Sequence, residues 1–388
     1  MITHEHALKN GTILNSYTII NVLGTGGFGI TYLAKDNKLG LKVVIKEYFP
    51  NELAVRKEDS TVISKSTTTE NDFKKGMQRF EEEAQTLARF NHLSIVKILG
   101  YFDANNTAYF VMEYEEGIDL SQHMKNHGTP FSQEEILTII IPILEGLKEV
   151  HRHNYLHRDI KPGNILLRAD KPPVLIDFGA SKLAIGEVSQ SITSMLTEGY
   201  APLEQYSSNI KQQGSFSDLY SVGAVIYKMI TGKVPTSSQT RSYEVLQEGF
   251  DPYKKLIDMD LNEYDENFLK AVDQVLFLKA KDRPQNVQEF QKDIIGKLIR
   301  KVPKDPVRSS FYGKYLLIVF VIVFTSIFGW YIMEQKNGTM QKQVTMEIPK
   351  DKKQIVHEYH ENNQKKAKEQ KYLEKVHIKV ENNKKKFE

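Results

Sequence analysis

Three polar residues in the run His157–Asn164, HRDIKPGN, have types and spacing suited to moving a phosphoryl group. Asp159 can accept the proton of an attacking hydroxyl as a general base. Asn164, five residues later, can hold Mg²⁺ through its side-chain oxygen, and Lys161 can steady the phosphate in transfer. The run follows an apolar helical stretch and precedes the strand-like ILLR, a context that favours a catalytic loop.

A second candidate metal ligand, this time a carboxylate, follows thirteen residues after Asn164, in Asp177-Phe178-Gly179. The apolar run VLI precedes it and indicates a buried strand that ends at the acid. A carboxylate in this place can bridge Mg²⁺ to the phosphates of a nucleotide. We therefore predict Asn164 and Asp177 as the metal ligands.

A glycine-rich turn precedes both motifs and consists of Gly24, Thr25, Gly26, Gly27, Phe28 and Gly29. It lies between two strand-like runs, YTIINVL and TYLAKD, whereas the same pattern in a dinucleotide-binding fold leads from a strand into a helix. Without side chains, the glycines let the backbone approach phosphate oxygens closely. The turn is therefore predicted to cover the phosphates of ATP.

Lys46 lies at the end of the next strand-like run, LKVVIKEYF. An ammonium group at a buried strand position is costly unless an acid pairs with it. Three consecutive acids, Glu81, Glu82 and Glu83, occur in the following helical segment, and spacing alone does not choose among them. Such a pair would hold Lys46 on the α- and β-phosphates.

The apolar pattern around these residues changes from strands to helices along the chain. Strand-like runs occupy residues 16–49, a helix follows at residues 74–90, and residues 97–114 form a hairpin that turns at Asn105-Asn106. Residues 50–72 are polar and predict a loop. After Gly117 the pattern is helical, with a capping box of Ser132 and Glu135. The predicted fold class is α+β, with a small β-rich lobe and a larger α-helical lobe.

Composition narrows the functional classes. The chain has 388 residues, 40% hydrophobic content, a net charge of +3 and no cysteine. This excludes disulfides and thiolate metal sites, and the near-balanced charge gives no reason to expect a nucleic-acid partner. His151, His153 and His157 cluster, but no cysteine or acid completes a metal-binding set, so we predict no histidine metal site.

One apolar run is long enough to cross a membrane. Residues 315–333 carry no charge, and a helix of this length spans about 28 Å, close to the ~30 Å hydrocarbon core. Lysine and arginine residues are concentrated before the run, which places the N-terminal side in the cytoplasm. The predicted organisation is an N-terminal extension (1–15), a main domain (16–300), a basic linker (301–314), a transmembrane helix (315–333) and a charged extracytoplasmic tail (334–388) that is helical or disordered.

Taken together, these motifs make the chain similar to the bacterial eukaryotic-type (Hanks-type) serine/threonine protein kinases in their single-pass membrane form. The resemblance covers residues 16–300 and includes GGFGITYLA, KEYFP, FEEEAQTLARFNH and GYAPLEQY. It implies the bilobal kinase fold and transfer of the γ-phosphate of ATP to protein hydroxyl groups. It also favours Glu83 over its neighbours, because Glu83 precedes Ala84 as in the helix pattern of the family.

The resemblance implies further roles for individual residues. Met112 is expected as the gatekeeper, and Glu113–Glu115 as the hinge that meets adenine. Asp119 is expected at the ribose, and Leu166 in the nucleotide site. Other implied roles are a brace for the catalytic loop (Asp218), an ion pair of the activation segment (Glu204 with Arg283), and a serine/threonine pattern (Lys161 with Thr197). Thr31 and Val44 depart from the usual residues of the adenine walls.

The expected cofactors are ATP and Mg²⁺, with Mn²⁺ as a substitute metal. The expected partners are protein substrates, the inner (cell) membrane through one helix, and a second copy of the chain for autophosphorylation in trans. Candidate phosphorylation sites are Ser189, Ser191, Thr193 and Ser194, with Arg158 as the phosphate-binding residue. The alternatives are a pseudokinase scaffold and a small-molecule kinase, and the complete set of catalytic residues and the GYAPLE run argue against them.

Overall fold

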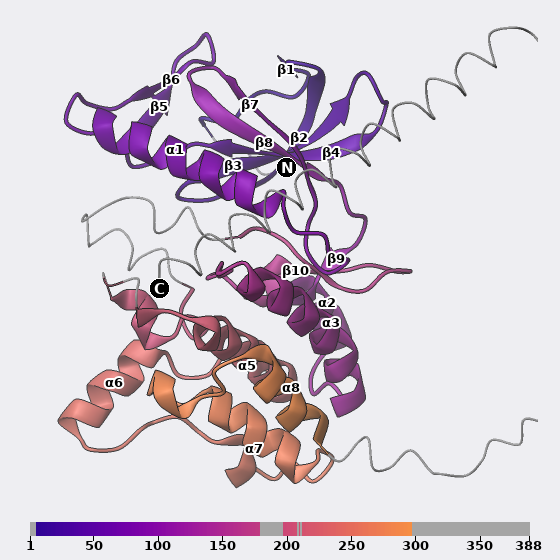
Figure 1. Ribbon diagram of the computed structural model, residues 1–388, viewed down its shortest axis with the longest axis vertical. Coiled ribbons are helices and arrows are strands. Elements are labelled where there is room, and N and C mark those ends of the chain that lie inside the picture. Colours follow the sequence, from indigo (N-terminus) through magenta and orange to yellow (C-terminus); the bar gives the residue numbers. More distant parts are fainter. Residues whose placement is uncertain (1–4, 179–196, 208, 210–211, 297–388) are drawn as a thin grey trace, which may run out of the picture. The chain divides into compact units, whose positions relative to one another are not determined.

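A computed structural model describes residues 5–178, 197–207, 209 and 212–296, which form two lobes (Figure 1). The first lobe is a sheet covered by one long helix, and the second is built almost entirely of helices. The predicted bilobal α+β architecture is confirmed.

An antiparallel sheet forms the small lobe, with strand order β1-β2-β3-β4-β8-β7. Its strands are β1 (Ile13–Leu14), β2 (Tyr17–Thr25), β3 (Gly29–Asp36), β4 (Lys42–Tyr48), β7 (Ile98–Ala104) and β8 (Thr107–Glu113). In β3, Ile30, Tyr32 and Ala34 are buried at alternate positions, as expected for a strand with one face on a core. The predicted turn between β7 and β8 is confirmed, with positive φ at both Asn105 and Asn106.

Helix α1 (Glu70–Leu87) covers one face of this sheet (Figure 1). Its buried stripe includes Phe73, Phe80, Ala84 and Leu87, spaced as a helix requires. The ring of Phe80 stacks on that of Phe110 in β8, with centroids 4.7 Å apart. The same helix carries Glu83, whose side chain is buried beside this apolar stripe.

Residues of the predicted N-terminal extension (1–15) pack onto the small lobe. Leu8 and Leu14 are buried in the small-lobe core, and β1 pairs with the start of β2. The backbone N–H of Leu8 also donates to the hydroxyl of Tyr32. The described part of the predicted N-terminal extension therefore belongs to the small lobe. The few apolar residues of this segment are separated by polar ones and show no periodicity, so the sequence did not predict that the segment packs on the lobe.

The predicted loop of residues 50–72 is also wrong in part, because it contains a hairpin of β5 (Ala54–Arg56) and β6 (Val62–Ser64). Ala54 and Val62 are fully buried, so the hairpin has an apolar side despite its polar composition. Its position is set by Val62, whose N–H donates to Asn105 O and whose carbonyl accepts from Asn106 Nδ2.

A buried carboxylate joins this hairpin to the sheet. Glu47 in β4 is fully buried, and its carboxylate pairs with Nη2 of Arg56 at 2.6 Å. The hydroxyls of Tyr32 and Tyr109 donate to the same carboxylate at 2.7 and 2.5 Å. The Nε of Arg56 in turn donates to His6 O, so one network connects the N-terminal segment, the sheet and the hairpin.

The large lobe is a helical bundle. Its helices are α2 (Leu120–His127), α3 (Gln133–Arg152), α5 (Ser215–Thr231), α6 (Ser238–Gln247), α7 (Glu266–Val275) and α8 (Val287–Ile295). Both hydrogen bonds of the predicted capping box of Ser132 and Glu135 are present at the start of α3. Nearly all of α5 is buried, which places it at the centre of the lobe.

A small three-stranded sheet carries the motif residues between these helices and the small lobe. It consists of β9 (Ile118–Asp119), β10 (Ile165–Leu167) and β11 (Val174–Leu175), in the order β11-β10-β9. A short 3₁₀ turn, Pro162–Asn164, leads into β10, and Asp177 follows β11. Antiparallel pairing of Ile165 with Leu175 therefore brings Asn164 and Asp177 to the same end of this sheet.

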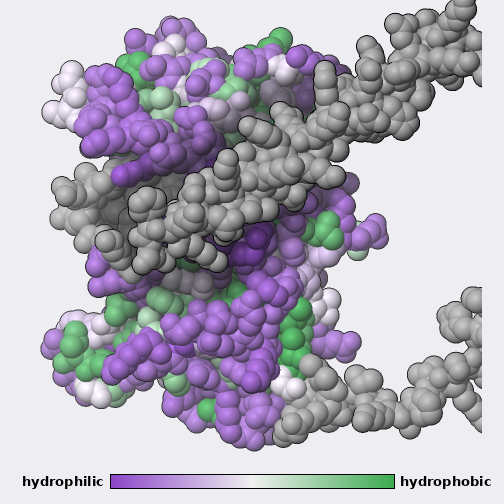
Figure 2. All heavy atoms as spheres, viewed as in Figure 1, coloured by the Kyte–Doolittle hydropathy of each residue, from purple (hydrophilic) through white to green (hydrophobic). Residues whose placement is uncertain are grey.

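Most of the described surface in the view of Figure 2 is hydrophilic, and hydrophobic residues gather over α6. Tyr243, Leu246 and Phe250, in or just after α6, are more than half exposed. Such a group is larger than the single apolar residues that every protein surface carries.

The linker, the predicted transmembrane helix at residues 315–333 and the tail lie outside the described residues. Within the residues that the structure describes, no helix has both the length and the apolar character needed to cross a bilayer.

Candidate active site

A buried acid from the centre of the large lobe fixes the loop that contains Asp159. Asp218, in the first turn of α5, is fully buried and accepts the N–H groups of His157 and Arg158, each at 2.9 Å. A third bond comes from Nε2 of His151 at 2.8 Å. Burial alone would raise the pKa of Asp218, but the hydrogen bond and charge of His151 hold it below its usual value.

These bonds hold a backbone conformation that is rarely populated. Arg158 has φ of 67°, in the left-handed region that side-chain-bearing residues seldom adopt. Asp218 bonds the N–H of Arg158 itself and that of the residue before it, so the core of the lobe holds this strained conformation. The loop thereby presents Asp159 in one orientation.

Asp159 lies at the centre of a second hydrogen-bond network. Lys161 Nζ contacts one carboxylate oxygen of Asp159 at 2.9 Å, and Thr197 Oγ1 donates to the other at 3.2 Å. Lys161 Nζ also donates to Thr197 Oγ1 at 3.3 Å. The Nδ2 of Asn164 donates to both the carbonyl and the carboxylate of Asp159, at 2.7 and 3.1 Å. The structure therefore brings together the predicted base, the predicted phosphate-steadying lysine and Thr197.

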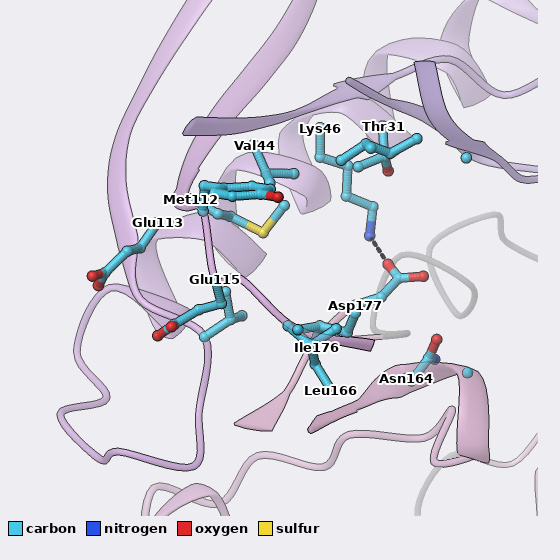
Figure 3. A pocket seen from close by; sticks show the side chains of 16 residues that line it. Thr31, Val44, Lys46, Met112, Glu113, Glu115, Asn164, Leu166, Ile176 and Asp177 are labelled. Carbon is cyan, nitrogen blue, oxygen red and sulfur yellow. Dashed lines mark hydrogen bonds and ion pairs between the residues drawn. The ribbon is translucent and has the colours of Figure 1, made fainter. Parts of the chain in front are cut away.

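A cavity of about 420 Å³ lies between the lobes, with a volume in the usual range for small-molecule sites. Its lining includes Gly24, Lys46, Met112, Glu113, Glu115, Asn164, Leu166 and Asp177, all predicted nucleotide-site residues. Figure 3 shows Met112 and Glu113 at one end and Lys46, Asp177 and Asn164 at the other. The cavity thus has an end for a flat apolar group and an end for charged groups.

Lys46 pairs with a different acid from the one predicted. Its Nζ lies 2.6 Å from Oδ1 of Asp177, whereas Glu83 acts on it as a nearby charge rather than as a direct ion-pair partner. Burial alone would lower the pKa of Lys46, but the charges of Asp177, Glu83 and Asp159 raise it above its ordinary value. Three carboxylates surround one ammonium group, and Asp177 at the strand end makes the closest approach.

Asn164 and Asp177 offer the oxygen ligands that Mg²⁺ prefers. The amide nitrogen of Asn164 is engaged with Asp159, which orients its oxygen toward Asp177 (Figure 3). Both side chains line the cavity at its charged end. The donor set therefore fits a magnesium ion bound together with phosphates.

Other predicted residues lie at the edge of the cavity or beyond it. The described residues that line the cavity do not include Thr25, Gly26, Gly27, Phe28 and Gly29, which form the end of β2, the turn and the start of β3. Asp119 does not line it either, because its carboxylate accepts the N–H of Gln122 and caps α2. The side chain of Glu115 is bound by Arg168 and Lys171, at 2.5 and 3.2 Å.

The predicted pair of Glu204 and Arg283 is present and buried. Arg283 bonds both carboxylate oxygens of Glu204, at 2.7 and 3.2 Å, and its Nε donates to Phe277 O. The hydroxyl of Ser217 donates to the same carboxylate at 2.8 Å. Glu204 belongs to a short 3₁₀ turn, Leu203–Tyr206, which this network anchors to α5 and to the segment after α7.

The three clustered histidines have separate structural roles. His151 bonds Asp218, His153 bonds Glu149 O, and the Nδ1 of His157 accepts the N–H of Asp159. No group of three metal-binding side chains occurs among the described residues. The predicted phosphorylation sites, Ser189, Ser191, Thr193 and Ser194, lie outside the described part of the chain.

Several lining residues were not assigned to the site from sequence. They are Leu23, Val96, Gly117, Gly163 and Ile176. Leu23 and Ile176 directly precede motif residues, and this adjacency could have indicated that they line the site. Val96 is not adjacent to any motif. Its N–H donates to Leu175 O, and such a contact between distant segments cannot be predicted from local sequence.

Comparisons with known proteins agree with this geometry. A family model described as the protein kinase domain matches residues 17–305. Serine/threonine-protein kinase B of Synechocystis sp. is 33% identical over 299 residues, which cover 73% of this chain and 47% of that protein. Serine/threonine-protein kinase D of the same organism is 37% identical over 238 residues, which cover 58% of this chain and 43% of that protein.

Among solved structures, the apo form of PpkA-294 is similar with a TM-score of 0.67 and 33% identity. The match covers 75% of this chain and 100% of that chain. By contrast, this chain spans less than half the length of the two curated relatives.

Replacing Asp218 by alanine should destabilise the large lobe and release the strained loop. Three buried donors lose their acceptor, and breaking such a network costs on the order of 3–5 kcal/mol of unfolding free energy. Urea unfolding of the Asp218→Ala chain measures this loss. The matched control is Asp282→Ala, at an exposed position of the same lobe. An equal, small effect of both substitutions would contradict the role of Asp218.

Proposed function

The chain belongs to the protein kinase family, and from this premise we propose that it is a serine/threonine protein kinase that transfers the γ-phosphate of ATP to protein hydroxyl groups. One observation carries the proposal: Asp159, Lys161 and Thr197 contact one another beside Asn164, which lines the same cavity as Lys46 and Asp177. A base, a phosphate-binding cation and two metal ligands therefore lie in one continuous site.

Each residue can then be given a task. Magnesium bound by Asn164 and Asp177 would supply positive charge to the phosphates. Lys46 would bind the α- and β-phosphates once its ammonium group exchanges Asp177 for them, with Glu83 near enough to stabilise its charge. Asp159 would orient the substrate hydroxyl and accept its proton.

The contact of Lys161 with Thr197 supports serine and threonine as the acceptors. The ammonium group of Lys161 bonds one carboxylate oxygen of Asp159, and the hydroxyl of Thr197 bonds the other. Lys161 is thereby held where it can neutralise the phosphoryl group as the hydroxyl attacks.

We further propose activation by autophosphorylation of the segment around residues 189–194, in trans between two copies. Arg158 supports this proposal, because its Nε is buried and has no hydrogen-bond partner among the described residues. Burial lowers the pKa of Arg158, against the opposing charge of Asp218, so a further negative group would stabilise the guanidinium. A phosphate on the segment around residues 189–194 would provide such a negative group.

Membrane attachment is a separate proposal that depends on sequence alone. The uncharged run 315–333 would form one transmembrane helix, with the basic linker and the kinase domain on the cytoplasmic side of the cell membrane. Attachment would concentrate copies of the kinase in two dimensions and favour reaction in trans.

Asparagine in place of Asp159 should abolish phosphate transfer while ATP remains bound. Loss of a general base lowers the rate by about 10²- to 10⁴-fold. The measurement is transfer of labelled phosphate from ATP, with Mg²⁺, to the full chain and to a basic protein. Asp170→Asn, at an exposed position, is the control and should keep full activity. A wild-type chain that binds ATP and transfers nothing would indicate a pseudokinase instead.

Alanine at all four sites Ser189, Ser191, Thr193 and Ser194 should leave the kinase in its low-activity state, because no phosphate then reaches Arg158. Activity is compared with the wild type after incubation with Mg-ATP, and the phosphorylated peptides are mapped by mass spectrometry. A triple alanine variant of Ser66, Thr67 and Thr68, which are exposed, controls for the loss of surface hydroxyls. Undiminished activity of the first variant would reject activation at these sites.

Cysteine labelling can test the membrane proposal, because the natural chain has no cysteine. In intact cells, Gln364→Cys in the tail should react with a membrane-impermeant maleimide, whereas Ser66→Cys in the kinase domain should react only after lysis. Deletion of residues 315–333 should release the chain from the membrane fraction. Labelling of Ser66→Cys in intact cells would overturn the predicted orientation.

A further inference from the structure

The segment that follows β4 runs along the glycine-rich turn and bonds it at three successive carbonyl groups. The N–H of Phe49 donates to Phe28 O at 2.9 Å, and the N–H of Asn51 donates to Gly27 O at 3.0 Å. The side-chain Nδ2 of Asn51 donates to Gly26 O at 3.1 Å. The register of β3 with β4 pairs Gly29 with Tyr48, so these bonds continue the ladder past the end of the strand.

Asn51 contributes two of the three bonds, one from its backbone and one from its side chain. The orientation of its amide follows from chemistry, because the reverse placement would set the amide oxygen against Gly26 O. Its Oδ1 is buried and has no partner among the described residues. An unsatisfied buried oxygen is unfavourable, yet the side chain keeps its hydrogen bond to Gly26. This indicates that the bond itself, and not only packing, matters at this position.

The turn is also held by packing. Phe28, at the tip, is 8% exposed and packs with Leu53, which is equally buried, in a small cluster of their own. The supporting segment is itself fixed, since Lys65 Nζ donates to Asn51 O at 2.7 Å and Lys65 N donates to Leu53 O at 2.8 Å. Lys65, which directly follows the β5–β6 hairpin, thus holds the segment by two hydrogen bonds.

This arrangement determines which backbone groups of the turn remain available. Carbonyl oxygens would repel phosphate, and those of residues 26, 27 and 28 are bonded to the supporting segment. Among the described residues, the N–H groups of Gly27 and Phe28 donate to no other group. Peptide N–H groups in such a turn can bind an anion.

We propose that Asn51 is a positioning residue for the phosphates of the nucleotide, acting through the glycine-rich turn. It bonds the carbonyls of Gly26 and Gly27 and thereby holds the neighbouring N–H groups in place for the β- and γ-phosphates. This inference rests on the proposed binding of ATP in the cavity. It gives a function to the segment between β4 and the hairpin.

A positioning role and a purely structural role predict different results with different ligands. If Asn51 acts on the turn, its loss weakens ligands that carry phosphates and leaves adenosine unaffected, because adenosine occupies only the cavity. If Asn51 only stabilises the small lobe, its loss weakens all three of ATP, ADP and adenosine alike, or only lowers the unfolding temperature.

The test replaces Asn51 by leucine, which has a similar size and no donor, in the full chain. Calorimetry measures the dissociation constants of Mg-ATP, Mg-ADP and adenosine, and thermal unfolding checks the fold. Loss of one hydrogen bond should raise the dissociation constant of Mg-ATP by about threefold to tenfold. The constant for adenosine should not change. Glu52→Gln, at the exposed neighbouring position, is the control and should match the wild type.

Two outcomes would overturn the inference: unchanged affinity for Mg-ATP in Asn51→Leu, or an equal loss of affinity for Mg-ATP and adenosine. Failure of the proposed ATP binding gives a different result, since the wild-type chain would then bind none of the three ligands, and failure of phosphate transfer alone would leave these affinities measurable. If Asn51→Leu unfolds at a much lower temperature, Asn51→Ala provides a second test, because it removes the same side-chain donor without placing an apolar side chain of similar size against Gly26 O. The same selective loss for Mg-ATP is expected there, and an unchanged affinity would count against the inference.

Discussion

An ionised carboxylate buried in the middle of the large lobe costs several kcal/mol unless the fold surrounds it with donors. Asp218 meets that requirement with the backbone of His157 and Arg158 and the ring of His151. The acid and the loop depend on each other: the loop supplies donors for a charge that could not otherwise stay buried, and the charge holds a backbone conformation that the loop would not adopt alone. Asn164, at the charged end of the cavity, is placed relative to this loop through its bonds to Asp159.

The second constraint is the number of negative charges close to the ammonium group of Lys46. The charges of Asp177, Glu83 and Asp159 raise the pKa of Lys46, and Asp159 also contacts the second ammonium group of the site, that of Lys161. Such a site has a strong electrostatic reason to accept cations, and the carboxylate and amide oxygens at hand suit a hard divalent ion. The direct contact with Asp177 and the longer-range effect of Glu83 are therefore two parts of one electrostatic balance, in which a phosphate group would compete for the lysine.

The grouping of Asp159, Asn164 and Asp177 could be predicted from sequence because their spacing reflects short loops with few alternative conformations. Asp159, Asn164 and Asp177 belong to segments joined by a two-strand pairing, so their proximity follows from local structure. The partner of Lys46 could not be predicted, because choosing between Asp177 and Glu83 depends on how the helix α1 sits on the sheet. The burial of Leu8 and the presence of the β5–β6 hairpin could not be predicted for a related reason. Their apolar residues are few and irregular, and only contacts with distant segments bury them.

The network around Glu47 has a consequence for how this sequence can change over evolutionary time. Its carboxylate is shared by two tyrosines from separate strands and by an arginine from the hairpin, which also holds the N-terminal segment. A single substitution at any of these positions leaves a buried charge or hydroxyl without its partner, whereas a concerted replacement by apolar residues would not. We therefore expect the four residues of this network to be conserved or replaced together: Glu47, Arg56, Tyr32 and Tyr109. Among related chains, the presence of the hairpin should covary with the acid that follows the active-site lysine.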